Sequence, residues 1–114
     1  MKTAAQFSEE LSEGFARMGS LANYKDAVYT LVLSGQESGE FHVVVKDGMA
    51  SVQADTDSPV DCVLTMNNDD FAQLLEGKLP GTTAYMMGKL KVTGDLSLAL
   101  QLESLLKVAE KHVH

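Results

Sequence analysis

The sequence has little cysteine, little positive charge and no long apolar run. It contains 114 residues, one cysteine and no tryptophan. A single cysteine excludes an internal disulfide and fits a reducing compartment. Lysine and arginine number 9 against 16 for aspartate and glutamate, which gives a formal charge of -7. This balance argues against nucleic acid as a partner, because phosphates require a cationic face.

Targeting and membrane signals are also missing from the sequence. No stretch approaches the roughly 18 consecutive apolar residues of a membrane span. The N-terminal residues lack the apolar run of a signal peptide. The chain ends in Lys-His-Val-His and not in a Ser-Lys-Leu-type peroxisomal address. We therefore expect a cytoplasmic protein.

Patterns typical of catalysis and metal binding are weak. There is no Gly-x-Ser-x-Gly elbow, Walker motif or dinucleotide glycine pattern. Cys62 is expected in an apolar strand with no basic neighbour in sequence, which favours an inert thiol. Asp55, Asp57 and Asp61 lack the glycine and terminal glutamate of a calcium loop. We therefore expect no enzyme activity, no bound metal and no cofactor.

The first half of the chain predicts one helix followed by three strands. Thr3 and Gln6 form a capping-box pattern, and apolar residues then recur at helical spacing as far as Met18. Three β-branched or alternating segments follow, at residues 28–33, 41–46 and 49–54. The Asp47-Gly48 pair predicts a hairpin between the last two. Alternation places Phe41, Val43 and Val45 on the inward face.

The second half predicts strand, helix, short helix, strand and helix, within a single domain over residues 1–114. The strands are expected at residues 62–66 and 88–94. Asn67 or Asn68 should cap the first helix, with Gly77 at its end, and Thr82 or Thr83 should cap a short helix over residues 84–87. Asp95 should cap the last helix.

The last helix carries leucines on two faces. At 100° per residue, Leu98, Leu102, Leu105 and Ala109 form one stripe, flanked by Leu106. Leu96 and Leu100 point almost the opposite way and need a partner. The alternatives are another part of this chain, a second subunit or partner enzyme, or transient contact with a membrane surface.

The second half also holds more large apolar side chains than one small core requires. Methionines fall in or beside elements that should face the core, and methionine adapts to irregular space and varied ligands. One interpretation is plain core filling. The other is an apolar pocket of about 300–1,000 Å³ for a lipid-like ligand.

The same region resembles the sterol carrier protein 2 (SCP-2) family. The resemblance rests on the segments Asp61-Cys62-Val63-Leu64-Thr65-Met66, Asp70-Phe71, Leu74-Leu75, Gly77-Lys78-Leu79, Ala84-Tyr85-Met86-Met87-Gly88-Lys89-Leu90-Lys91-Val92-Thr93-Gly94-Asp95, Leu98-Ala99 and Leu102. It implies an α/β (α+β) fold: a five-stranded mixed, largely antiparallel sheet with helices on one face around a hydrophobic tunnel. It also implies binding and transfer of fatty acids, fatty acyl-CoA and sterols without catalysis.

Carried over by position, the resemblance supplies a set of expected ligand-binding residues. The tunnel lining would comprise Phe71, Leu74, Leu75, Met86, Met87, Leu90, Leu98, Leu102, Leu105 and Leu106. Strand residues Phe41, Val43 and Val45 are added by alternation alone. We expect a stand-alone, prokaryotic-type homologue that binds acyl chains, with the final helix as a gate. The alternative is an accessory module that presents an apolar intermediate to a partner enzyme.

Overall fold

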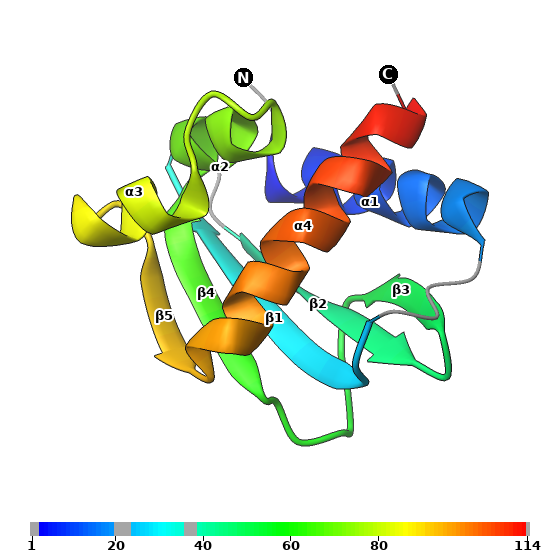
Figure 1. Ribbon diagram of the computed structural model, residues 1–114. Helices are drawn as coiled ribbons and strands as arrows, with labels where there is room; N and C mark the ends of the chain where they lie inside the picture. Colours follow the sequence, from blue (N-terminus) through cyan, green and yellow to red (C-terminus); the bar gives the residue numbers. More distant parts are fainter. Residues whose placement is uncertain (1–2, 20–23, 36–38, 114) are drawn as a thin grey trace.

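The computed structural model describes residues 3–19, 24–35 and 39–113. Over these residues the chain forms four helices and five strands (Figure 1). In chain order they are α1 (Ala4–Met18), β1 (Ala27–Ser34), β2 (Gly39–Lys46), β3 (Met49–Gln53), β4 (Cys62–Asn67), α2 (Asn68–Leu75), α3 (Gly81–Met86), β5 (Lys91–Gly94) and α4 (Leu96–Val113).

The strands form one mixed sheet in the order β3-β2-β1-β4-β5. Only β1 and β4 run parallel, with Leu31 opposite Leu64, and the other neighbours are antiparallel. The crossover that makes this possible ends at Asp61. Its backbone N–H donates to the Val28 carbonyl at 2.8 Å, and its carboxylate accepts from the Val28 N–H at 2.8 Å. The predicted largely antiparallel, five-stranded sheet is confirmed.

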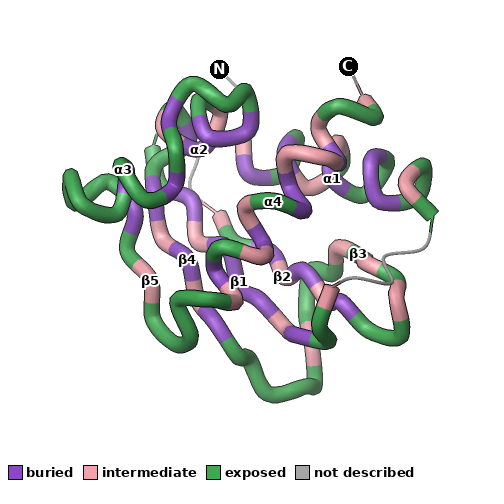
Figure 2. Tube along the Cα trace, viewed as in Figure 1, coloured by how far each residue is buried: buried purple, intermediate pink, exposed green. Residues whose placement is uncertain are grey.

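All four helices lie on one side of this sheet (Figure 1). On β2 and β4, residues therefore alternate between buried positions under the helices and half-buried or exposed positions on the uncovered face (Figure 2). On β1 the covered positions Tyr29, Leu31 and Leu33 are fully buried. This period of two follows from the pleat of the strand, and it places the core between sheet and helices.

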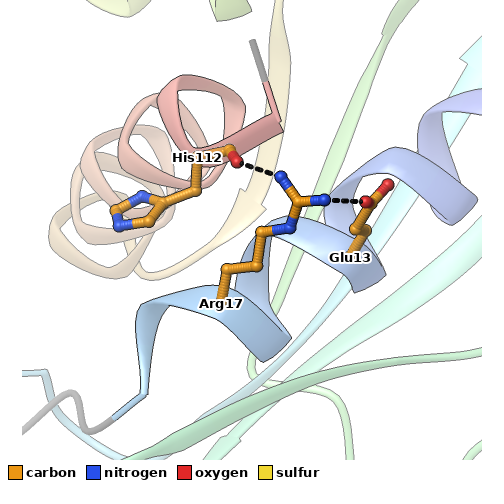
Figure 3. Close-up of polar contacts among 3 residues, drawn as sticks. All are labelled: Glu13, Arg17 and His112. Atoms are coloured by element: carbon orange, nitrogen blue, oxygen red, sulfur yellow. Dashed lines mark hydrogen bonds and ion pairs between the residues drawn. The ribbon is translucent and has the colours of Figure 1, made fainter.

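Helix α1 packs tightly on α4. Gly14 of α1 meets the Ala109 backbone so closely that a Cβ at this position would overlap it. The Arg17 guanidinium, paired with Glu13 one turn earlier, donates to the carbonyl of His112 at 2.8 Å (Figure 3). The predicted capping box is confirmed, since Thr3 and Gln6 bond each other reciprocally.

The helix starts of the second half differ in part from expectation. Asn67 is the cap of α2, and its side chain accepts from the Asp70 N–H at 2.7 Å. The prediction that a threonine caps α3 was wrong. Helix α3 begins earlier, at Gly81, after Pro80, which makes no side-chain cap bond. Proline fixes φ near the value that suits the residue before a helix. The backbone N–H of Gly81 has no acceptor within α3 and donates to a distant side chain, described below.

Candidate functional site

A cavity of about 180 Å³ lies between the β4–β5 side of the sheet and helices α2, α3 and α4. The surface that it presents is apolar. Its wall comprises Leu31, Leu64, Met66, Phe71, Leu74, Gly81, Thr82, Tyr85, Met86, Leu90, Val92, Leu96, Ala99, Leu100, Glu103 and Leu106. It is smaller than the roughly 300–1,000 Å³ typical of small-molecule sites.

The sheet supplies the floor of the cavity. Leu31, Leu64 and Val92 are register partners on the adjacent strands β1, β4 and β5, so they form a row across the sheet. Met66 lies two residues beyond Leu64 on the same face. Because residues in register on one face are direct neighbours, these side chains make a continuous apolar floor.

Helix α4 presents two separate stripes. One contains Leu102, Leu105 and Ala109, which are fully buried, and Ala109 meets α1 at Gly14. The other contains Leu96, Ala99, Leu100, Glu103 and Leu106, which line the cavity. Helical spacing puts each set on its own face. The helix thus closes the core with one side and borders the cavity with another.

The mouth of the cavity is ringed by exposed apolar side chains. Tyr85 and Met86 of α3 lie on the wall and are 47% and 85% exposed. Leu96 and Leu100 of α4 lie on the wall too, and each is 46% exposed. The two leucines expected to need a partner therefore border an apolar opening together with α3.

Glu103 ties the start of α3 to α4. Its carboxylate accepts from the backbone N–H of Gly81 at 2.9 Å and pairs with Lys107 Nζ at 2.8 Å. A Cβ at Gly81 would overlap this carboxylate. Glycine at position 81 therefore permits the close approach that lets one side chain hold the two helices on opposite sides of the mouth.

The buried titratable groups lie outside the cavity wall. Burial raises the pKa of the Cys62 thiol, helped by the nearby Asp95 and Asp61 carboxylates, and its Sγ donates to the Asp95 carbonyl at 3.6 Å. Burial likewise raises the pKa of Tyr29 to about 12, partly offset by a hydrogen bond from the Gln101 amide. A thiol held protonated is a poor nucleophile.

The described residues contain neither clustered metal ligands nor a helix that could span a membrane. Within residues 3–19, 24–35 and 39–113, no three His, Cys, Asp or Glu side chains come together to hold a metal ion. In the same ranges, no helix combines the length and apolar character needed to cross a bilayer. What the cavity can do chemically is exclude water from an apolar group.

The expected ligand-binding residues fall into four groups by location. Those on the cavity wall are Phe71, Leu74, Met86, Leu90 and Leu106. Those elsewhere in α2 and α4 are Leu75, Leu102 and Leu105, which are buried, and Leu98, which is half-buried. Met87 is 60% exposed and off the wall. The structure thus brings five of them together around one cavity.

The fourth group, on β2, lies toward α1. Phe41, Val43 and Val45 are buried in the core at the α1 side of the sheet. Phe41 also borders a second hollow of about 350 Å³, which is more open and partly polar, beside Ala4 and Gly39. Alternation gave the correct face for these residues, but all four helices share that face, and the first cavity lies under α2, α3 and α4 and not under α1.

Sequence reasoning missed several wall residues. Leu31 could not be placed, because the parallel pairing of β1 with β4 leaves no local pattern. Leu64 and Met66 lie in the strand predicted at residues 62–66 but were not assigned to the site. Ala99, Leu100 and Glu103 follow Leu96 by three, four and seven residues, which places them on the second stripe of α4. That helical spacing was the signal in the sequence that could have identified them.

Comparison with known proteins gives the class to which this fold and cavity correspond. The profile of the SCP-2 sterol transfer family matches residues 5–107, and the chain belongs to this family. Membership implies binding or transfer of lipids. The family resemblance inferred from the sequence is thereby confirmed.

Individual relatives agree with this assignment. Hydroxysteroid dehydrogenase-like protein 2 of Xenopus tropicalis is 38% identical over 108 residues, which is 90% of this chain and 26% of the relative. The apo structure of sterol carrier protein 2 from Yarrowia lipolytica matches with a TM-score of 0.64 and 27% identity, covering 90% of this chain and 78% of the other. The sterol carrier protein domain 2 of Helicoverpa armigera shares the fold, with a TM-score of 0.73 and 24% identity over 92% and 86%.

Proposed function

We propose that this protein binds and transfers lipids with a single apolar chain, namely fatty acids and fatty acyl-CoA, without catalysing a reaction on them. Sterols are a further candidate class. The observation that carries the proposal is the apolar cavity whose mouth is bordered by exposed apolar side chains. The compartment that we propose is the cytosol, which the unpaired Cys62 thiol favours.

Burial of the chain supplies the binding energy. Each CH₂ that leaves water contributes about 0.8 kcal/mol, so a sixteen-carbon chain gains on the order of 12 kcal/mol before the costs of ordering. The cavity of about 180 Å³ accommodates only part of such a chain. Binding a whole chain therefore requires the wall to move outward.

Helix α3 is the wall that we expect to move, together with the start of α4. It has six residues, and the Glu103–Gly81 hydrogen bond joins its first residue to α4. Met86, with the most exposed large apolar side chain on this wall, has three rotatable bonds and adapts to varied ligand shapes. This extends to α3 the gating role that we expected of α4 alone.

The test is displacement of a fluorescent fatty acid by palmitate. Ala99 is buried on the cavity wall, and Ala99→Phe fills part of the space. The loss of room for two or three CH₂ groups should weaken binding about tenfold or more. Ala16→Phe, at an exposed position on α1, is the matched control and should bind normally.

Thermal unfolding checks that both variants fold. The proposal fails if the unchanged protein does not bind the fatty acid. It also fails if folded Ala99→Phe binds as tightly as Ala16→Phe.

A second candidate function is that of an accessory module which presents an apolar intermediate to a partner enzyme. The observation in its favour is that this chain spans 26% of a relative named as a dehydrogenase-like protein. A stable complex in a pulldown, with the purified protein free of lipid in native mass spectrometry, would favour this function. A co-purified lipid with no partner would favour the carrier.

A further inference from the structure

Polar side chains occur at only one end of the cavity. Among the described residues on its wall, three have polar side chains, namely Thr82, Tyr85 and Glu103. Thr82 and Tyr85 belong to α3 and are exposed, and Glu103 of α4 bonds the first residue of α3. The polar head of a ligand therefore has polar neighbours and water where α3 meets α4.

Glu103 is engaged with the protein rather than with the interior of the cavity. Its carboxylate accepts from the Gly81 N–H at 2.9 Å and pairs with Lys107 Nζ at 2.8 Å. A carboxylate held by two donors in this way is already satisfied where it stands. The surface that the cavity presents is accordingly apolar, although a charged side chain borders it.

The end of the cavity farthest from water is built of apolar side chains. Leu31, Phe71 and Leu106 are the most deeply buried large side chains on the wall, between 0 and 1% exposed. They come from β1, α2 and α4, and we call the place where they meet the inner end. Met66 of β4, on the floor, is buried as well. The chain terminus of a bound lipid should therefore lie among these residues.

The backbone around the inner end is already hydrogen-bonded. Strand β4 lies between β1 and β5 and pairs with both, so the N–H and C=O groups of the floor belong to the two ladders. Phe71 and Leu106 lie inside α2 and α4, where helical hydrogen bonds engage these groups. A hydroxyl or carboxylate brought to the inner end therefore meets only carbon and the Met66 sulfur on the described wall.

We propose that the cavity selects its ligand by the far end of the chain. It accepts lipids whose chain ends in a methyl group and rejects those with a second polar group there, namely ω-hydroxy acids and α,ω-dicarboxylic acids. This inference rests on the proposed function, since it concerns the same cavity and the same acyl chains.

The physical basis of this selection is the loss of hydrogen bonds to water. A hydroxyl at the inner end gives up these bonds and gains none, which should weaken binding about tenfold to a hundredfold. A carboxylate should weaken binding further, because a charge is harder to remove from water. The protein therefore carries chains before, and not after, oxidation of their methyl end.

The experiment compares palmitate, heptadecanoate, 16-hydroxyhexadecanoate and hexadecanedioate in displacement of a fluorescent fatty acid. Heptadecanoate and 16-hydroxyhexadecanoate differ only in a methyl or a hydroxyl group at the same position, so length and shape are matched. The unchanged protein should bind heptadecanoate at least as tightly as palmitate, and the hydroxy acid about tenfold to a hundredfold more weakly. Hexadecanedioate should bind more weakly still. This comparison requires no variant.

Methionine substitutions test where the far end lies. Glutamine is as long and unbranched as methionine, and its amide both donates and accepts. Met66→Gln supplies a partner on the buried floor, so it should reduce the preference for heptadecanoate over the hydroxy acid about fivefold or more. Met86→Gln makes the same change at the mouth, where it should weaken binding of both ligands alike and keep their ratio. Thermal unfolding checks that both variants fold.

Two results would overturn this selection and leave the carrier function intact. The first is that the unchanged protein binds 16-hydroxyhexadecanoate as tightly as heptadecanoate. The second is that folded Met66→Gln reduces the preference no more than Met86→Gln does. If neither palmitate nor heptadecanoate binds, the carrier proposal fails and the selection proposal fails with it.

Discussion

The two sides of the core differ although one sheet underlies both. On the α1 side, Phe7, Leu11 and Phe15 fill the space over the sheet, and Gly14 allows α1 to touch α4. On the α2–α3–α4 side, Ala99 occupies a position where a larger residue would fill the space, and a cavity of about 180 Å³ remains. A small residue therefore has a different effect on each side of the core. On the α1 side, Gly14 lets the backbones of two helices touch, whereas on the other side no helix fills the space that Ala99 leaves.

Phe7 and Phe71 mark the boundary between the two sides. Their rings meet edge to face with centroids 4.9 Å apart, joining α1 to α2. Phe71 also lies on the cavity wall. The filled side thus supports the rigid part of the wall, while α3 forms the part that faces water. Substitutions on the filled side should therefore reduce stability more than ligand binding, and substitutions on the cavity side should reduce ligand binding more than stability.

The largest effect on stability is expected from Leu11→Ala. Leu11 is fully buried on the filled side, and its truncation should lower the free energy of unfolding by about 3–4 kcal/mol. Leu90→Ala, on the cavity wall, should cost about 1–2 kcal/mol less, because part of its surface already faces a void. Urea denaturation of both variants measures the difference. Equal losses would mean that the cavity is closed in solution.

Alkaline pH should produce the next largest effect. The pKa of Tyr29 is raised to about 12 by burial, against 10.0 when exposed. The folded state therefore keeps its proton where the unfolded chain loses it, so stability is complete below pH 10 and falls as pH rises toward 12. The loss from this group should reach about 2–3 kcal/mol.

Urea denaturation across this pH range, compared between the unchanged protein and Tyr29→Phe, isolates the contribution of Tyr29. The variant starts less stable, because the Gln101 amide loses one of its two acceptors and keeps only the Lys25 carbonyl, but its stability should fall less steeply above pH 10. If the two proteins lose stability with the same slope, Tyr29 titrates normally and the packing around it is looser than described.

The same substitution on each side gives a more direct comparison. In Gly14→Ala the added methyl meets the Ala109 backbone, which cannot move alone, so a cost of about 2–3 kcal/mol is expected. In Gly81→Ala it meets the flexible Glu103 side chain, and loss of that hydrogen bond should cost about 1 kcal/mol. Gly81→Ala should also speed fatty-acid uptake in stopped-flow fluorescence, whereas Gly14→Ala should not.

The smallest effect on stability is expected at the mouth. Leu100→Ser removes a half-exposed side chain and should change the free energy of unfolding by less than about 1 kcal/mol. Palmitate affinity should nevertheless fall, because Leu100 lines the cavity. A large loss of stability with normal affinity would show that Leu100 belongs to the filled core.

The sequence predicted the elements and their order well, because these depend on local patterns. The Thr3–Gln6 capping box, the Asp47-Gly48 hairpin and the alternation of β4 each reside in a few neighbouring residues. The start of α3 was missed because its first N–H bonds Glu103, which lies 22 residues away. No local pattern records an acceptor at that distance.

The cavity wall was predicted less completely, for a related reason. Periodicity tells which face of an element turns inward, but it does not tell what that face meets. Val43 and Leu64 both turn inward, and only the strand order places one under α1 and the other on the cavity floor. On α4, the predicted lining follows the stripe through Leu102, and the cavity in the structure borders the stripe through Leu96 and Ala99.

The most direct test of the account is a palmitate titration followed by NMR of protein labelled with ¹³C at the methionine methyls. Met66 and Met86 lie on the cavity wall, and Met49 lies on β3 at the opposite edge of the sheet. The account predicts that the Met66 and Met86 signals shift and saturate together while the Met49 signal stays in place. Unmoved Met66 and Met86 signals, or equal movement of Met49, would contradict an acyl chain inside this cavity.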